Sequence, residues 1–272
     1  MSAPVILVTG STDGIGKATA IELARAGAEV IIHGRKRSKG LAVLAEVSKA
    51  GGDKPGLIVA DYSETGQVRA MAREVVSGYT KLDVLVNNAG TYQKTRKLTK
   101  EGVEMTFAVN YLAPFLLTNL LLPLIRRSSP SRIVTVGSSA HEDVHGIDWD
   151  DLVARERYDP WEAYAFSKFA DIVFTYALAR RLSGTRVTAN CLHPGVVETK
   201  VLWSSYPGYN GITPLEGAET SVYLALSPEV SGVSGKYFDK RRPVQSSDLT
   251  YDEEIQERLW NLAGQLTGFR GD

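Results

Sequence analysis

Tyr164 and Lys168 are the residues whose types and spacing point most directly to chemistry. They lie four positions apart in a segment, 161–182, whose apolar spacing predicts a helix, so both side chains would leave one face about a turn apart. A phenol can give or take a proton, and an ammonium beside it favours the phenolate, so the pair could exchange a proton with a substrate hydroxyl. The same spacing also occurs on helices for structural reasons, so the pair needs supporting residues.

Ser138 offers a hydrogen-bond donor for the same chemistry. It follows a β-branched run, 132–137, that predicts a buried strand, and open α/β sheets bind ligands at the carboxyl ends of their strands. Its hydroxyl could donate to a carbonyl oxygen as negative charge develops there. Ser139 carries the same group one position later and is the alternative.

Asn110 lies in an apolar segment predicted to be helical. A buried amide there must have a hydrogen-bond partner, so Asn110 could be a structural residue, either at a helix kink or in a buried hydrogen bond. His193 is a rival proton shuttle, because histidine titrates near neutral pH. It directly precedes Pro194 at a strand end, however, where a structural hydrogen bond is favoured. No histidine has ligand-like spacing with other histidines, cysteines or carboxylates, so we expect no catalytic metal.

A glycine-rich turn follows the first predicted strand. It reads Thr9-Gly10-Ser11-Thr12-Asp13-Gly14-Ile15-Gly16, with the spacing G-x-x-x-G-x-G. Gly10 can adopt the positive φ of a tight turn, while Gly14 and Gly16 let backbone N–H groups and a helix N-terminus approach a pyrophosphate. A plain βα loop could carry the same glycines, but the position after the first strand favours a dinucleotide site.

The elements that must position these residues follow a regular alternation of short β-branched runs and longer segments of helical period, which predicts βαβ units. Seven strands are expected at 5–9, 29–33, 56–60, 84–87, 132–137, 186–192 and 236–238, with helices starting near Ile15, Lys39, Thr65, Glu101, Trp161 and Leu215. Residues 1–272 should therefore form one α/β domain, a Rossmann-type doubly wound sheet of about seven parallel strands flanked by helices. An amphipathic helix over 251–268 should pack on the sheet or on a neighbouring subunit.

The amino-acid composition limits the classes of partner that we expect for this protein. Lys and Arg together number 31, as do Asp and Glu, so the chain lacks the positive field typical of nucleic-acid binding. The N-terminus shows no secretion signal, and the most apolar segment, 111–125, is expected to be too short for a bilayer span and to form a buried or interface helix. The single cysteine, Cys191, should be a small buried residue. We expect a cytoplasmic protein with no nucleic-acid partner and no membrane span.

Taken together, these motifs resemble the short-chain dehydrogenase/reductase family in order and spacing from about residue 4 to 240. The resemblance rests on the glycine turn, Asn87-Asn88-Ala89-Gly90, Asn110, Ser138, Tyr164-x-x-x-Lys168 and Pro194-Gly195. It implies hydride transfer between an alcohol or carbonyl and a nicotinamide cofactor, with Tyr164 as acid/base and Lys168 on the nicotinamide ribose. It also implies that Asn110 holds a water linking Lys168 to solvent. The runs Leu259-Trp260 and Val196-Val197-x-Thr199 are most similar to the retinol-dehydrogenase-like branch.

The resemblance also assigns cofactor contacts along the chain. The pyrophosphate would lie on Gly10, Ser11, Thr12, Asp13, Gly14, Ile15 and Gly16, and the adenine edge on Asp61 and Tyr62. The adenosine ribose side would be lined by Asn87, Asn88, Ala89 and Gly90, and the nicotinamide side by Pro194, Gly195, Val197 and Thr199.

The end of the second strand predicts NADP(H) in preference to NAD(H). An acid at this position would accept hydrogen bonds from the ribose 2′-hydroxyl of NAD and repel a 2′-phosphate. Gly34 stands there instead, followed by Arg35, whose guanidinium can bind a phosphate through two charge-assisted bonds. The basic run 35–37 could also be a solvated helix start, but it coincides with the missing acid.

Two segments, 139–162 and 198–214, are free to shape a substrate pocket. The first carries Trp149, Tyr158 and Trp161, and the second Trp203, Tyr206 and Tyr209 with Gly208 and Gly211 as candidate hinges. Aromatic loops over a cleft favour an apolar or aromatic small molecule over a sugar phosphate. A retinoid is suggested by analogy, but fold analogy cannot name a substrate.

Two other functions stay open at this point: a non-catalytic NADP-binding sensor, and a sugar-nucleotide epimerase or dehydratase, which also uses Tyr-x-x-x-Lys. We further expect a homodimer or homotetramer formed through the helices at 111–125 and 161–182, because their apolar content exceeds one core-facing stripe.

Overall fold

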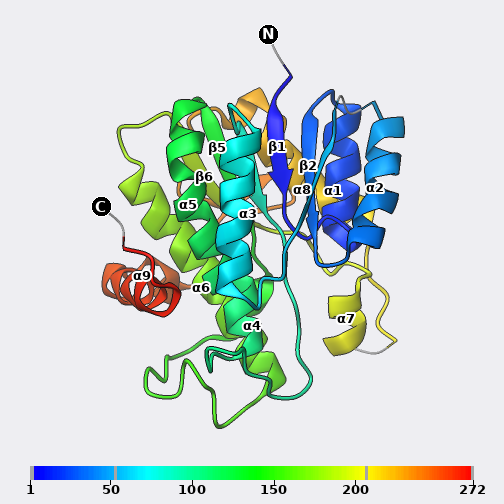
Figure 1. The fold of residues 1–272 in the computed structure, drawn as a ribbon. Coiled ribbons are helices and arrows are strands. Elements are labelled where there is room, and N and C mark those ends of the chain that lie inside the picture. Colours follow the sequence, from blue (N-terminus) through cyan, green and yellow to red (C-terminus); the bar gives the residue numbers. More distant parts are fainter. Residues whose placement is uncertain (1–2, 52–53, 206–207, 271–272) are drawn as a thin grey trace.

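The computed structural model describes residues 3–51, 54–205 and 208–270. Its centre is an eight-stranded sheet of order β3-β2-β1-β4-β5-β6-β7-β8, flanked by helices on both faces (Figure 1). The strands are β1 (Val5–Val8), β2 (Glu29–Gly34), β3 (Gly56–Val59), β4 (Val84–Asn87), β5 (Ser131–Val136), β6 (Val187–His193), β7 (Tyr237–Asp239) and β8 (Arg242–Val244). The chain winds outward in one direction from β1 and in the other from β4, which confirms the doubly wound Rossmann-type sheet.

The eighth strand was not expected. Strands β1 to β7 pair in parallel as predicted, whereas β8 pairs with β7 in the antiparallel direction. The two strands are joined by Lys240 and Arg241, which have φ values of 47° and 65°. Positive φ at both central residues is what a type I′ turn requires, and the usual sequence signal for it, Asn-Gly or Asp-Gly, is absent here. All three β8 residues are exposed, so the strand also lacks an alternating apolar pattern.

Helices cover the sheet on both sides, and the core is divided accordingly. On one face lie α1 (Gly14–Arg25), α2 (Arg37–Lys49) and α8 (Pro214–Leu226), and on the other α3 (Thr65–Gly78), α5 (Ala113–Arg127) and α6 (Pro160–Arg181). Within β1, Ile6 and Val8 join the first of these cores while Val5 and Leu7 join the second. Strands buried on both faces read as continuous apolar runs, which is why they could be predicted.

The expected apolar helix is longer than predicted. It begins with α4 (Met105–Phe107), passes through a π-helical turn, η1 (Ala108–Leu112), and continues as α5. The whole helix, Met105–Arg127, has 23 residues, and its most apolar 18-residue window has a mean hydropathy of 1.6, so the expectation that it is too short to cross a membrane is wrong on length. Of its most apolar 18-residue window, 78% is buried inside the molecule. Packing in the core accounts for this apolar content.

The expected C-terminal amphipathic helix is present as α9 (Glu253–Thr267), but it packs across α5 and α6 and not directly on the sheet (Figure 1). The Trp260 ring lies edge-on to Phe115, with centroids 5.0 Å apart, and stacks on Phe174 at 5.7 Å. The Arg181 guanidinium lies 3.9 Å from the Trp260 ring centroid and pairs with Glu257. Helix α9 therefore covers apolar surface on the two helices that were expected to associate between subunits.

Candidate active site

A cavity of about 960 Å³ runs along the carboxyl ends of the strands. Its walls include the segments that follow β1, β2, β4, β5 and β6, and it spans the point between β1 and β4 where the strand order reverses. Open α/β sheets bind their ligands at this point, because the helices on either side of the reversal diverge. The volume lies at the upper end of the range for small-molecule sites.

The glycine-rich turn lines one half of this cavity through Gly10, Thr12, Asp13, Gly14, Ile15 and Gly16. Ser11, expected on the pyrophosphate, is buried instead, and its hydroxyl donates to the Val8 carbonyl at 2.8 Å. Gly10 and Gly14 have φ values of 64° and 51°, the left-handed conformation expected of glycine. A Cβ on Gly16 would lie 2.5 Å from the Gly10 carbonyl oxygen, so the turn closes only with glycine there. Helix α1 begins at Gly14, with the Asp13 side chain accepting from the Gly14 N–H at 3.0 Å. The remaining N–H groups of this first turn could hold a pyrophosphate.

His33 supports the turn from below. Its Nδ1 accepts a hydrogen bond from the Gly10 N–H at 3.2 Å, and its Nε2 lies 3.1 Å from the Ala60 carbonyl. Since a carbonyl can only accept, Nε2 carries the proton and the ring is neutral. Tyr62, expected at the adenine edge, is buried and stacks on the His33 ring with centroids 4.7 Å apart. The Tyr62 ring therefore packs against the imidazole that accepts the hydrogen bond from the glycine-rich turn.

The end of β2 carries the positive charge that the sequence suggested. A Cβ on Gly34 would lie 2.4 Å from the Thr12 methyl group, so the turn itself occupies the space that an acidic side chain would need. Arg35 is exposed, lines the cavity, and reaches to 4.0 Å from the Asp61 carboxylate. Lys36 and Lys39 line the same end. A phosphate entering here would meet three cationic side chains.

Asn88, Ala89 and Gly90 line the cavity as expected, but Asn87 does not. The Thr9 hydroxyl accepts hydrogen bonds from the backbone N–H groups of Asn88 and Ala89, both at 3.0 Å. The Asn88 amide donates to the Thr9 carbonyl at 2.8 Å. Asn87 is buried on the other side of the strand end, where its amide donates to Thr118 at 2.9 Å. Because successive side chains of a strand point to opposite faces, the Asn87 side chain points away from the cavity.

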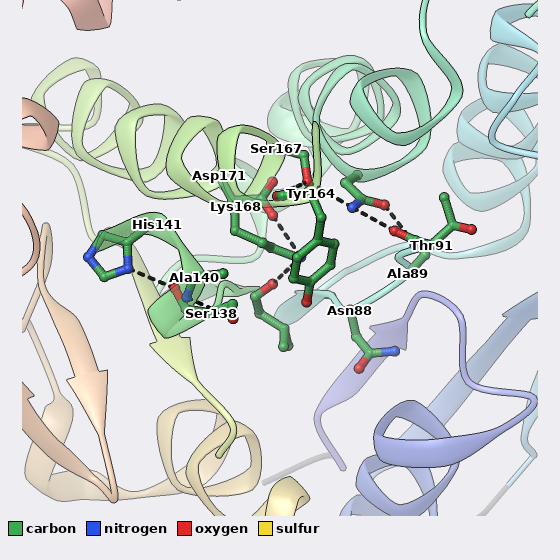
Figure 2. A network of polar contacts seen from close by, with 12 residues as sticks. Asn88, Ala89, Thr91, Ser138, Ala140, His141, Tyr164, Ser167, Lys168 and Asp171 are labelled. Carbon is green, nitrogen blue, oxygen red and sulfur yellow. Dashed lines mark hydrogen bonds and ion pairs between the residues drawn. The ribbon is translucent and has the colours of Figure 1, made fainter. Parts of the chain in front are cut away.

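Tyr164 and Lys168 come from one face of α6, which Asp159 caps. Tyr164 projects toward the side of the site where Ser138 and Asn88 lie (Figure 2). The Lys168 Nζ donates to the Val136 carbonyl and to Asp171 Oδ2, both at 2.9 Å. Burial disfavours the ammonium, but the Asp171 carboxylate more than offsets this and raises the pKa of Lys168. Burial raises the pKa of Asp171 to about 6, against the attraction of Lys168.

Ser138 follows β5 and lines the cavity together with Ser139. Its side chain accepts from the Ala140 N–H at 3.2 Å, and this caps the short 3-10 helix η2 (Ser139–Asp143). The hydroxyl proton of Ser138 is thus free to be donated elsewhere. The Ser139 N–H donates to His193 Nδ1 at 3.1 Å. This is the structural hydrogen bond expected for His193. Burial lowers the pKa of the His193 imidazole.

Asn110 lies in the π-helical turn η1, and its side-chain amide has a positioning function. Oδ1 accepts from the Thr91 N–H at 2.7 Å, while Nδ2 donates to the Thr91 carbonyl at 3.0 Å and to the Ser167 hydroxyl at 2.9 Å. Ser167 in turn donates to the Tyr164 carbonyl at 2.7 Å. The amide therefore joins the loop after β4 to α6.

Pro194, Gly195, Val197 and Thr199, expected on the nicotinamide side, all line the cavity. Gly195 has a φ of 89°. Val197 is buried and pairs with Ile212 in an isolated parallel bridge. A Cβ on Gly14 would lie 3.1 Å from the Thr199 methyl group, so this segment closes directly over the glycine turn. The sequence did not indicate Lys200, which forms an ion pair with Asp13 across the same junction.

The aromatic residues of the two loops divide between the cavity and its surroundings. Trp161 and Tyr209 line the cavity, whereas Trp149, Tyr158 and Trp203 do not, and Tyr206 lies outside the described residues. Segment 198–214 contains the short helix α7 (Lys200–Ser205). Gly208 has a φ of 83°, but Gly211 is no hinge, because a Cβ there would lie 2.3 Å from the Val196 carbonyl oxygen.

Tyr92 is the aromatic residue that the sequence analysis missed. Its ring centroid lies 5.8 Å from that of Tyr164, and the Trp161 ring centroid lies 6.0 Å from that of Tyr164. Tyr92 follows the Asn88-Ala89-Gly90 segment after one residue, Thr91. Met105 and Val109 lie nearby in the cavity wall. Within the described ranges, no group of three His, Cys, Asp or Glu side chains is placed to hold a metal ion.

Known proteins resemble this chain in sequence and in fold. Residues 4–210 match the family described as short chain dehydrogenase. Retinol dehydrogenase 14 of Homo sapiens is 40% identical over 98% of this chain and 87% of its own length. Polyprenol dehydrogenase of Homo sapiens is 39% identical over 97% of this chain and 85% of its own length.

Solved structures agree with this match. An uncharacterized protein from Mycobacterium paratuberculosis superposes with a TM-score of 0.80 and 32% identity, covering 97% of this chain and 93% of its own. A short chain dehydrogenase from Escherichia coli CFT073, solved in complex with NADPH, gives a TM-score of 0.74 and 27% identity, covering 89% of this chain and 98% of its own.

The buried imidazole below the glycine turn makes the fold sensitive to acid. Burial lowers the pKa of His33 to about 4, whereas an unfolded histidine titrates near ~6.5. The stability gained from neutral His33 is therefore fully present above pH ~6.5 and is lost as the pH falls toward ~4, by up to about 3 kcal/mol. We expect His33→Gln to reduce the loss of unfolding free energy between these pH values, measured by urea denaturation.

The exposed His145 provides the matched control for this experiment. His145→Gln should keep the full pH dependence of the parent protein. If His33→Gln also kept it, another group would carry the acid effect.

Proposed function

The chain belongs to the short chain dehydrogenase family, and we propose that within it this protein is an NADP(H)-dependent oxidoreductase. It interconverts an alcohol with an aldehyde or ketone on an apolar or aromatic small molecule, with Tyr164 as acid/base. The observation that carries this proposal is that Tyr164, Lys168 and Ser138 line the same cavity as the glycine-rich turn.

The residues present fit a dinucleotide. The first turn of α1 offers N–H groups to a pyrophosphate, and close packing at Gly10, Gly16 and Gly34 keeps side chains out of the cradle. Arg35 would bind the 2′-phosphate, with Lys36 and Lys39 beside it. When bound, the nicotinamide supplies or accepts the hydride, and this chemistry belongs to the cofactor.

The protein's own contribution is proton transfer and orientation. In carbonyl reduction, the Tyr164 hydroxyl gives its proton to the carbonyl oxygen, and the Ser138 hydroxyl donates a hydrogen bond to the same oxygen. Two of the three N–H donors of Lys168 are held by Val136 and Asp171. The third is left for a ribose hydroxyl, and the ammonium charge favours loss of the Tyr164 proton in the reverse reaction.

Apolar and aromatic side chains form part of the cavity wall, namely Tyr92, Met105, Val109, Trp161, Leu202 and Tyr209. Such a lining favours an apolar or aromatic carbonyl compound over a sugar phosphate. The names of the two human relatives refer to apolar alcohols, retinol and polyprenol, and we propose a substrate of that general class here. A cytoplasmic location and the absence of nucleic-acid partners remain predictions from composition.

Removing the Tyr164 hydroxyl tests the mechanism. Tyr164→Phe should lower turnover by roughly 10²–10⁴-fold, the contribution of a positioned proton donor, with little change in NADPH affinity. Turnover would be measured as NADPH consumption with a panel of aromatic and medium-chain aldehydes and ketones. Lys168→Ala should harm both NADPH binding and turnover.

Tyr158→Phe is the matched control, because Tyr158 does not line the cavity and its hydroxyl donates to the backbone carbonyl of Gln93. It should leave turnover nearly unchanged. Near-normal turnover of a folded, cofactor-binding Tyr164→Phe variant would contradict the mechanism and make His193 the next candidate.

Replacing Arg35 tests the cofactor preference. Arg35→Ala should weaken NADPH binding by roughly 10–100-fold, as expected for loss of one charge-assisted contact of about 1.5–3 kcal/mol, and should change NADH binding little. Binding would be titrated by fluorescence with both cofactors. Arg37→Ala, which removes a neighbouring cation outside the cavity wall, should have a small effect. Equal losses for both cofactors would mean that Arg35 only positions the loop.

Self-association also remains a prediction, and the structure limits the surface available for it. Residues 165–178 of α6 are all buried within one chain, and α9 covers part of α5. Leu120, Leu122 and Pro123 of α5 are left partly or fully accessible. We expect a dimer or tetramer by light scattering at micromolar concentration, and a monomeric mass would contradict this.

A further inference from the structure

Asp171 is a buried acid in direct contact with the proposed catalytic lysine. It lies three residues after Lys168 on α6, and its Oδ2 accepts a hydrogen bond from Lys168 Nζ at 2.9 Å (Figure 2). The side chains of Lys168 and Asp171 are only 7% and 3% exposed. Water and salt screen such a buried ion pair only weakly, so its two charges should act strongly on neighbouring groups.

The elements packed around this pair contribute neutral groups. Tyr111 of η1 faces Asp171, and burial together with the Asp171 charge raises its pKa. Cys191 of β6 also faces it, and burial raises the pKa of the thiol. On α6 itself, Tyr164 faces Lys168, and the Thr175 hydroxyl donates to the Asp171 carbonyl at 2.8 Å. Asp171 is therefore the negative charge of this cluster.

The two charges of the pair act on Tyr164 in opposite directions. The ammonium of Lys168 favours the phenolate, whereas a carboxylate beside that ammonium favours the phenol. As long as Lys168 stays protonated, an amide at position 171 would leave the ammonium charge acting on Tyr164 without this opposing carboxylate. A carboxylate instead cancels part of it while holding the ammonium in place against the Val136 carbonyl.

We propose that Asp171 is a positioning residue that fixes Lys168 by an ion pair and offsets part of the charge that the ammonium exerts on Tyr164. The inference rests on the proposed function, since it assigns Tyr164 the donor role in carbonyl reduction. It extends that function by naming a residue outside the Tyr-x-x-x-Lys motif that sets the pH range of the reaction.

Asp171→Asn tests the inference in the protein without cofactor, because the amide keeps the size and one acceptor oxygen but removes the charge. Ionisation of Tyr164 would be followed by phenolate absorbance, as the difference between each protein and its Tyr164→Phe counterpart, which isolates one of 12 tyrosines. We expect ionisation in the Asp171→Asn protein to move to lower pH by about one unit, a tenfold change in proton affinity.

The same substitution should shift the pH profile of carbonyl reduction. The pH at which kcat/KM falls to half its plateau should be lower by a similar amount. Asp171→Glu, which keeps the charge, should restore most of the original profile. Glu254→Gln, an exposed acid on α9 that gives the same change in net charge, should shift neither measurement. A purely structural role for Asp171 would lower thermal stability without moving either, and that result would overturn the inference.

A second comparison covers the case in which Asp171→Asn does not fold, since it leaves an unpaired buried charge. The double variant Lys168→Met, Asp171→Asn contains neither charge and is compared with Lys168→Met alone. Tyr164 should ionise at lower pH in the double variant, and equal values would overturn the inference. The absorbance measurements do not depend on turnover, so failure of this inference is distinguishable from an active Tyr164→Phe variant, which would contradict the proposed function.

Discussion

The hydrogen bond from Lys168 Nζ to the Val136 carbonyl is the contact on which the geometry of the site depends. Val136 is the last residue of β5, so this bond joins the helix that carries Tyr164, the proposed acid/base, to the strand end that carries Ser138. Gly137 allows the close approach, because a Cβ there would lie 3.2 Å from the Leu192 carbonyl oxygen and 3.6 Å from Ile172 on α6. Strand, helix and serine are thereby fixed relative to one another by a charged group that is itself buried and paired.

The cofactor half of the cavity is held by a comparable set of internal bonds. Thr9 and His33 hold the loops of this half together: the threonine hydroxyl joins the ends of β1 and β4, and the imidazole joins β2 to the glycine turn. Both halves thus consist of ligand-facing groups positioned by a buried layer behind them. Precise placement of this kind would let the proposed hydride and proton transfer occur without rearrangement of the protein.

Much of this arrangement could be predicted from sequence, and the exceptions share a physical cause. Buried parallel strands, the glycine turn and the Tyr164 to Lys168 spacing are local patterns, and they were predicted correctly. Strand β8, the outward turn of Asn87 and the position of Tyr92 depend on which partner lies across space, which spacing along the chain does not encode. Asp171 is intermediate: its spacing from Lys168 was visible, but only burial of both side chains gives the ion pair its importance.

The cover that α9 provides for α5 and α6 has a consequence during synthesis of the protein. Tyr111 donates its hydroxyl to the Leu259 carbonyl across a sequence separation of 148 residues, and Phe115 and Phe174 pack against Trp260. On the ribosome, the sheet and both helices are complete before residues 253–267 emerge. The aromatic faces of α5 and α6 therefore stay uncovered until α9 is made. During this interval the nascent chain is most prone to aggregate and to bind chaperones.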